Sequence, residues 1–138
     1  MIRLTQNGRM LGISIGVVYL WFGFLKFFPG LSPADLLAKQ TISLLTFNLV
    51  SENAGILLLA IIEAAIGLCL IFNLQLRRII VVALIHLVLT FIPVVFFPEI
   101  SFSKAPFSLT LVGQYIIKNI VIISALLLIY QRPYNRAS

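Results

Sequence analysis

The sequence predicts an all-α membrane protein that forms one four-helix transmembrane bundle over residues 1–138. Of its 138 residues, 61% are hydrophobic and 10% are charged, and the mean hydropathy is +1.12, whereas about 25% of residues in soluble domains are charged. Four apolar runs are long enough to cross about 30 Å of hydrocarbon as helices. Because four spans use most of this chain, we expect any function to lie inside the bundle or on its short loops.

The spans are expected at about residues 10–28, 54–72, 79–97 and 111–130. The first apolar run exceeds the roughly 7–15 residues of a cleaved signal sequence and no small-x-small site follows it, so we expect a retained helix. Basic residues outside the spans gather on one side, at Arg3, Arg9, Arg77, Arg78, Arg132 and Arg136. Only Lys39 and Lys104 lie in the opposite loops. The positive-inside rule therefore predicts that both termini are cytoplasmic.

The connection between the first two spans is too long for a bare turn. We expect a short amphipathic helix at the outer membrane interface, with Ser32 as its N-cap and Pro33 at its first position. The alternative is an ordered loop that caps the bundle. A second outer loop, residues 98–110, carries Phe102 and Phe107, which are expected at headgroup depth.

Composition excludes several kinds of chemistry. The single cysteine, Cys69, cannot form an intramolecular disulfide or a thiolate metal cluster. The single histidine, His86, cannot by itself build a zinc site or a bis-histidine haem site, and we expect it to be a hydrogen-bonded core residue. These counts mean that no metal site is predicted. The net charge of +6 follows from membrane topology, so no nucleic-acid partner is predicted either.

Small and polar residues mark one face of each span, as expected where helices pack inside a membrane. At helical spacing, these residues are Gly12, Gly16, Tyr19, Gly23 and Lys26 in the first span, Ala60, Glu63, Ala64 and Gly67 in the second, Ala83, His86, Thr90, Pro93 and Phe97 in the third, and Gln114, Tyr115, Lys118, Asn119 and Ala125 in the fourth. Pro93 is expected to bend its helix. If the four faces converge, they enclose a polar chamber.

Depth along the helices predicts an ion pair in this chamber. At about 1.5 Å per residue, Glu63 lies roughly 13 Å and Lys118 roughly 10 Å from the outer end of its span. An isolated charge there costs at least about 2.5–3.5 kcal/mol, so we expect Glu63 to pair with Lys118. Lys26 is nearer the interface and can extend its ammonium outward. The alternative is that the pair only fixes helix register.

Several motifs resemble the DoxX-like superfamily of small four-helix membrane proteins. The segment from Trp21 to Asp35 reads WFGFLKFFPGLSPAD, residues 63–67 read EAAIG, and residues 113–119 read GQYIIKN. The resemblance continues through residues 90–93 and 97–99 and covers nearly the whole chain. It implies a compact bundle in the cytoplasmic membrane, associated with quinol oxidation or thiosulfate:quinone oxidoreduction. Carried over to this chain, its motifs mark Lys26, Glu63, Gln114, Tyr115, Lys118 and Asn119.

The leading hypothesis is an accessory or ligand-binding subunit of a quinone-linked redox system. The predicted ligand-binding residues are Tyr19, Trp21, Lys26, Glu63, Thr90, Gln114, Tyr115, Lys118 and Asn119. No cofactor is expected to be covalently bound, and a quinone is the cofactor considered. Expected partners are membrane lipids and either subunits of a redox complex or a second copy of the chain. No autonomous catalytic motif is present, so at most the protein is a subunit of a quinone-dependent oxidoreductase.

Two other classes stay open at this point. A glutamate near the middle of the membrane is also typical of small proton-coupled transporters, which would require a dimer for alternating access. A nearby lysine argues against that class, because it occupies the carboxylate. The third class is a structural or assembly factor without a ligand.

Overall fold

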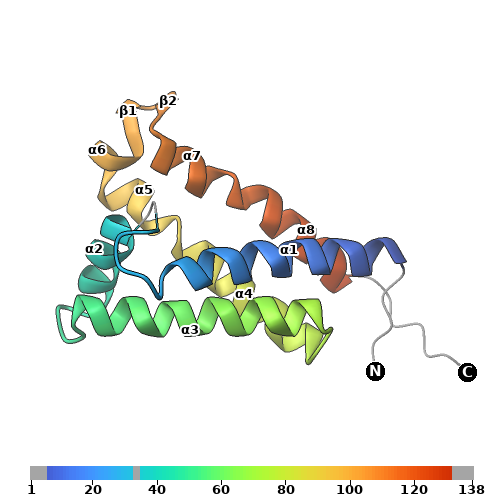
Figure 1. Ribbon diagram of the computed structural model, residues 1–138. Helices are drawn as coiled ribbons and strands as arrows, with labels where there is room; N and C mark the ends of the chain where they lie inside the picture. Colours follow the sequence, from blue (N-terminus) through green and yellow to red (C-terminus); the bar gives the residue numbers. More distant parts are fainter. Residues whose placement is uncertain (1–5, 33–34, 132–138) are drawn as a thin grey trace, which may run out of the picture.

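The computed structural model describes residues 6–32 and 35–131 (Figure 1). Within these residues, four helical segments are long and apolar enough to cross a membrane: Gln6–Leu25, Glu52–Ile71, Leu76–Phe96 and Leu111–Gln131. The chain is therefore a helical, multi-pass membrane protein, as predicted. The first span begins and ends earlier than expected, whereas the other limits agree within about three residues. Arg3, Arg132 and Arg136 lie outside the described residues.

The first two spans form the most closely packed pair of helices. Helix α1 (Gln6–Leu25) lies alongside α3 (Glu52–Ile71) in Figure 1. A Cβ atom on Gly16 would lie 2.8 Å from the carbonyl oxygen of Gly67, and one on Gly67 would lie 2.7 Å from the carbonyl oxygen of Gly16. Only glycine fits at both positions. The predicted inward face of the first span is confirmed, since its five residues are all buried.

The third and fourth spans are each interrupted. The third consists of α4 (Leu76–Leu89) and α5 (Ile92–Phe96), and the break precedes Pro93, which has no N–H to donate to a preceding turn. This confirms the predicted bend. The fourth consists of α7 (Leu111–Ile117) and α8 (Asn119–Gln131), with Lys118 between them. Thr110 caps α7, because its hydroxyl oxygen accepts from the backbone N–H of Gly113 at 3.1 Å.

The predicted inward face of the fourth span was right for Asn119 and in part for Tyr115 and Ala125, but wrong for Gln114 and Lys118. The residues of α7 and α8 that are buried are Gly113, Ile116, Asn119, Leu126 and Ile129. Gln114 and Lys118 are exposed, and Tyr115 is half-buried. The polar residues alone do not define the face, because large aliphatic side chains fill most of the space against α1 and α4.

The outer connections hold two further elements. The helix α2 (Asp35–Leu45) belongs to the connection between the first two spans in the sequence, and it contacts α3 and α5. The expected cap at Ser32 is not formed, because its buried hydroxyl has no hydrogen-bond partner among the described residues, and Pro33 lies outside those residues. The later loop contains α6 (Pro98–Ser101) and an antiparallel pair of short strands, β1 (Phe102–Lys104) and β2 (Ser108–Leu109). An all-α reading missed this pair, because two or three residues are too few to show a strand period.

The four spans differ in how closely they pack along their lengths. Toward the start of α1, a buried apolar cluster joins α1, α3, α4 and α8. Its members are Ile15, Tyr19, Ile66, Leu70, Leu76, Ile80, Ala83, Leu87, Leu126 and Ile129. In Figure 1, α7 and α8 diverge from α1 toward β1 and β2. The spans are therefore closely packed at one end and spread apart at the other.

Candidate functional site

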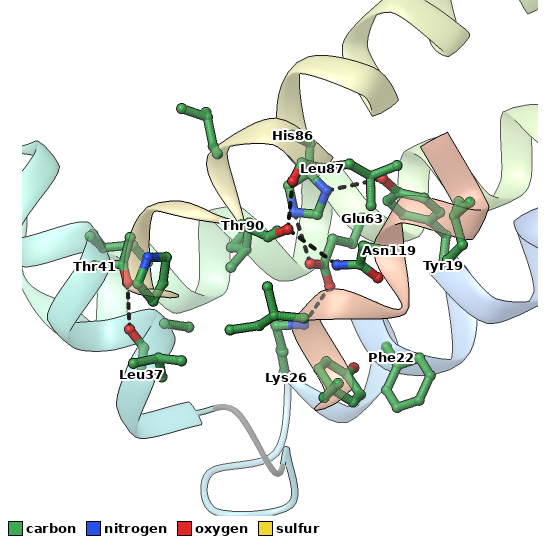
Figure 2. A pocket seen from close by; sticks show the side chains of 18 of the residues that line it. Tyr19, Phe22, Lys26, Leu37, Thr41, Glu63, His86, Leu87, Thr90 and Asn119 are labelled. Carbon is green, nitrogen blue, oxygen red and sulfur yellow. Dashed lines mark hydrogen bonds and ion pairs between the residues drawn. The ribbon is translucent and has the colours of Figure 1, made fainter. Parts of the chain in front are cut away.

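A cavity of about 210 Å³ lies at the spread end of the bundle (Figure 2). Side chains from all four spans and from α2 line it. Its walls are mostly apolar, and the polar side chains that line it are Tyr19, Lys26, Thr41, Glu63, His86, Thr90, Tyr115, Lys118 and Asn119. Several lining residues, including Val18, Leu45 and Leu89, are also exposed on the outside of the chain, so the cavity is open to its surroundings.

Glu63 forms a buried ion pair with Lys26. The Nζ of Lys26 lies 2.6 Å from Oε2 of Glu63, and the two side chains are only 6% and 8% exposed. Gly23 explains the contact, because a Cβ atom there would lie 2.9 Å from the Glu63 Cβ. At this close approach of α1 to α3, Lys26, one residue past the end of α1, reaches the carboxylate. The prediction that Lys26 extends its ammonium outward was wrong for this reason.

The second oxygen of Glu63 contacts His86. Its Oε1 lies 3.0 Å from the His86 Nε2, and the His86 Nδ1 lies 3.0 Å from the hydroxyl of Tyr19. The Tyr19 hydroxyl also lies 3.2 Å from the backbone oxygen of Ala83, to which it can donate its single hydrogen instead. We call Lys26, Glu63, His86 and Tyr19 the polar chain. It connects the first three spans, and Figure 2 shows its members in sequence beside the cavity.

The predicted ion pair between Glu63 and Lys118 was wrong. Lys118 is exposed, and its ammonium lies 4.1 Å from the centre of the Tyr115 ring and 4.8 Å from that of Phe22. These distances are typical of cation–π contacts. The prediction compared depth alone, whereas rotation about the helix axis turns Asn119 inward and leaves Lys118 on the outer side of the cavity.

Asn119 connects the fourth span to the third. Its Nδ2 donates to the Thr90 hydroxyl at 3.1 Å, and that hydroxyl donates to the backbone oxygen of Leu87 at 2.6 Å. Thr90 is the residue at which α4 ends. Its side chain therefore fixes the amide of Asn119 at the wall of the cavity and satisfies one carbonyl at the helix end.

Most of the predicted site residues meet at this cavity. Seven of the nine line it: Tyr19, Lys26, Glu63, Thr90, Tyr115, Lys118 and Asn119. Trp21 and Gln114 do not. Trp21 is 67% exposed on α1, and Gln114 points outward from α7. The prediction that Trp21 and Gln114 bind the ligand is therefore not supported for this cavity.

Sequence reasoning missed the central part of His86 and the contribution of Phe22 and Thr41. His86 was on the predicted inward face of the third span and was expected to be a hydrogen-bonded core residue, which is confirmed, but it was not among the predicted site residues. Its position one turn before Thr90 was the available signal. Thr41 comes from α2, whose approach to the cavity depends on a long connection that carries no periodic pattern.

Comparisons with protein-family models, with curated proteins and with solved structures found no match to this chain. The site is therefore interpreted from its own geometry. It combines an apolar cavity, the hydrogen-bonded polar chain along its wall, and a second ammonium, that of the exposed Lys118. Such a cavity suits an amphiphilic molecule with a polar ring or headgroup.

Proposed function

We propose that this protein is an accessory or ligand-binding subunit of a quinone-linked redox system, and that its cavity binds the headgroup of a quinone or a similar amphiphile. The observation that carries the proposal is the cavity itself, with apolar walls and the polar chain on one side. Pockets for whole drug-sized ligands measure about 300–1,000 Å³. A cavity of about 210 Å³ suits a single ring, with an alkyl tail outside among lipids.

The lining residues have distinct parts in this proposal. Tyr115 and Phe22 lie in edge-to-face contact, with ring centroids 5.0 Å apart, and provide an aromatic wall for a planar ring. Asn119 and Lys118 are the donors available to carbonyl oxygens of the ligand. Glu63 and Lys26 line the same cavity as a buried ion pair.

The proposal also covers the membrane in which the protein lies and the side on which its termini lie. We propose that the chain belongs to the DoxX-like superfamily, which implies the cytoplasmic membrane, and the basic residues around the termini favour cytoplasmic ends. In that orientation the cavity lies in the outer half of the bundle. The helix α2 lies at the outer interface, and its Leu37, Ala38 and Thr41 face the cavity.

Two contacts on Glu63 argue against the proton-coupled exporter. Its two oxygens are 2.6 Å from Lys26 and 3.0 Å from His86, so both already have basic partners. A cationic substrate would have to displace them. The apolar cluster also fills the other end of the bundle, on the side to which such a substrate would have to pass.

The proposal is tested by filling the cavity from α2. Ala38 is half-buried and lines the cavity, whereas Leu36 on the same helix is 65% exposed. Ala38→Phe places an aromatic ring in the cavity, and Leu36→Phe is the matched control. We expect radiolabelled decylubiquinone to bind the wild type and Leu36→Phe saturably in lipid nanodiscs, and to bind Ala38→Phe about tenfold more weakly.

Empty nanodiscs correct for partition of decylubiquinone into lipid. Equal uptake by empty nanodiscs and by nanodiscs that contain the protein would overturn the proposal. Saturable binding that Ala38→Phe leaves unchanged would place the ligand elsewhere on the protein and would equally overturn it.

A further inference from the structure

The hydrogen bonds around His86 constrain where its protons lie. The Glu63 carboxylate only accepts, so the His86 Nε2 at 3.0 Å must carry a hydrogen. On the other side of the ring, the Tyr19 hydroxyl lies 3.0 Å from Nδ1 and 3.2 Å from the Ala83 carbonyl oxygen. Tyr19 has one hydrogen and two neighbours that can take it.

Two arrangements satisfy these contacts without moving a heavy atom. In the first, His86 is neutral, its Nδ1 has no hydrogen, and the Tyr19 hydroxyl donates to Nδ1. In the second, His86 carries hydrogens on both nitrogens, Nδ1 donates to the Tyr19 oxygen, and the Tyr19 hydroxyl donates to the Ala83 oxygen. The second arrangement holds one more proton. The polar chain can therefore take up a proton at His86 without a change in its contacts.

The charges around the cavity show what would accompany that proton. The charged or titratable groups that face His86 and the cavity are Lys26 and Tyr19 from the first span, Glu63 from the second, and Tyr115 and Lys118 from the fourth; α2 adds none among the described residues. Lys26 and Glu63 neutralise each other at 2.6 Å. Lys118 contacts aromatic rings and has no carboxylate partner in the described part of the chain. A proton on His86 therefore adds a second uncompensated positive charge beside an apolar cavity.

Resting on the proposed function, we propose that the cavity binds the anion of a weakly acidic amphiphile, such as a hydroxyquinone, together with one proton held by His86. The anion lies near the ammonium of Lys118 and the amide of Asn119. The ammonium of Lys118 faces the anion, and the proton on His86 offsets the negative charge that the anion adds. Binding of the anion and the proton together leaves the net charge of the cavity as it is in the free protein, so no additional net charge enters an apolar site.

The transfer is heterolytic and balanced. When the neutral acid enters from the lipid, its O–H bond breaks and the electron pair stays on the ligand oxygen. An N–H bond forms at the His86 Nδ1, through the Tyr19 hydroxyl that contacts this nitrogen. The Tyr19 hydroxyl ends with a hydrogen directed at the Ala83 oxygen. No electron donor or acceptor is needed.

The experiment compares an acid with an ether that cannot ionise. The acid is a 2-hydroxy-1,4-naphthoquinone with a decyl chain at C3, and the control is its 2-methoxy ether. Near neutral pH this hydroxyquinone is an anion in water. We expect its binding, measured by calorimetry in two buffers of different ionisation enthalpy, to take up about one proton per site. Binding of the ether should take up none.

Histidine nitrogen NMR locates the proton. His86 is the only histidine in the sequence, so labelling histidine with ¹⁵N gives an unambiguous signal. The first arrangement predicts one protonated and one unprotonated ring nitrogen in the free protein. With the hydroxyquinone bound, both nitrogens should be protonated. Proton uptake with an unchanged imidazole signal would overturn the assignment to His86.

Two variants distinguish a proton-accepting role of His86 and Tyr19 from a purely structural one. His86→Gln retains an N–H donor toward Glu63 but cannot ionise, and Tyr19→Phe removes the group that contacts Nδ1. We expect each to lower the affinity for the hydroxyquinone, relative to that for the ether, by about tenfold. Because Tyr19→Phe removes one oxygen atom only, it keeps the test available if His86→Gln fails to fold.

The outcomes distinguish the two proposals. If decylubiquinone and the ether bind at the cavity but the hydroxyquinone binds without proton uptake, this inference is overturned and the proposed function stands. If none of the three ligands binds, both are overturned.

Discussion

The two ends of this bundle are built from the same helices but held together by different forces. Toward the start of α1, glycine backbones and aliphatic side chains pack directly, as at Gly16, Gly67 and Leu70. Toward α2 and the short strands, the helices spread apart and polar side chains connect them across a cavity. The first end resembles an ordinary membrane helix interface. The second holds buried polar groups that close packing would exclude.

This difference assigns stability and binding to separate parts of the molecule. Close packing at one end fixes α1 against α3, so that Gly23, Glu63 and Lys26 meet without further adjustment. A cavity can then persist at the other end, because its walls are already held in place. Substitutions at the two ends should therefore have effects of different size and kind.

The largest expected effect comes from Glu63→Leu. It leaves the ammonium of Lys26 buried without its partner, and breaking a buried pair in this way costs about 3–5 kcal/mol. Unfolding in mixed micelles by added SDS, followed by circular dichroism, measures the change in free energy. Lys26→Met in the same chain should recover most of the loss, since the unpaired charge is then gone. Equal stability of Glu63→Leu and the double variant would contradict the buried pair.

The next largest effect is expected at the packed end, from Gly67→Ala. Its new Cβ would lie 2.7 Å from the backbone oxygen of Gly16, so α1 and α3 must separate, at a cost of about 1–3 kcal/mol. Gly12→Ala is the matched control, because a Cβ there would have no atom within 4 Å in the described part of the chain outside its own helix backbone. It should leave stability unchanged or raise it by up to about 1 kcal/mol. Equal losses at Gly67 and Gly12 in the same unfolding assay would contradict the close approach.

A smaller loss is expected from Thr90→Val at the polar end. Valine keeps the shape but leaves the Asn119 amide, which donates to Thr90 at 3.1 Å, without that acceptor. The expected cost is about 1 kcal/mol. Thr90→Ser retains the hydroxyl and should behave as the wild type in thermal unfolding. If Thr90→Ser loses as much as Thr90→Val, the methyl group and not the hydrogen bond carries the effect.

How much of this could be predicted from the sequence depends on which signal was available. The number of spans follows from hydropathy alone, because a bilayer imposes a length on each helix. The inward faces of the first two spans follow from glycines and one glutamate at helical spacing. The fourth span has no glycine stripe along α8, and its buried aliphatic residues cannot be told from lipid-facing ones by type.

The sequence predicted most of the residues that line the cavity, but it did not predict which of them form the ion pair. Depth along a helix can be counted from the sequence, whereas the rotation of each helix and the break at Lys118 cannot. That is why Glu63 was assigned to Lys118 and Lys26 was left at the interface. A glycine three residues before Lys26 on the same face was the clue that this lysine approaches α3.

The smallest expected effect on stability, and the sharpest test of that correction, comes from comparing the two lysines. Lys118→Met removes an ammonium that only contacts the rings of Tyr115 and Phe22, so stability should change by less than about 1 kcal/mol. Lys26→Met leaves Glu63 with His86 alone and should cost several times more. SDS unfolding of the two variants side by side measures the ratio. If Lys118→Met is the more destabilising, Glu63 depends on Lys118 in the membrane, and the division between a supporting pair and a ligand-facing lysine fails.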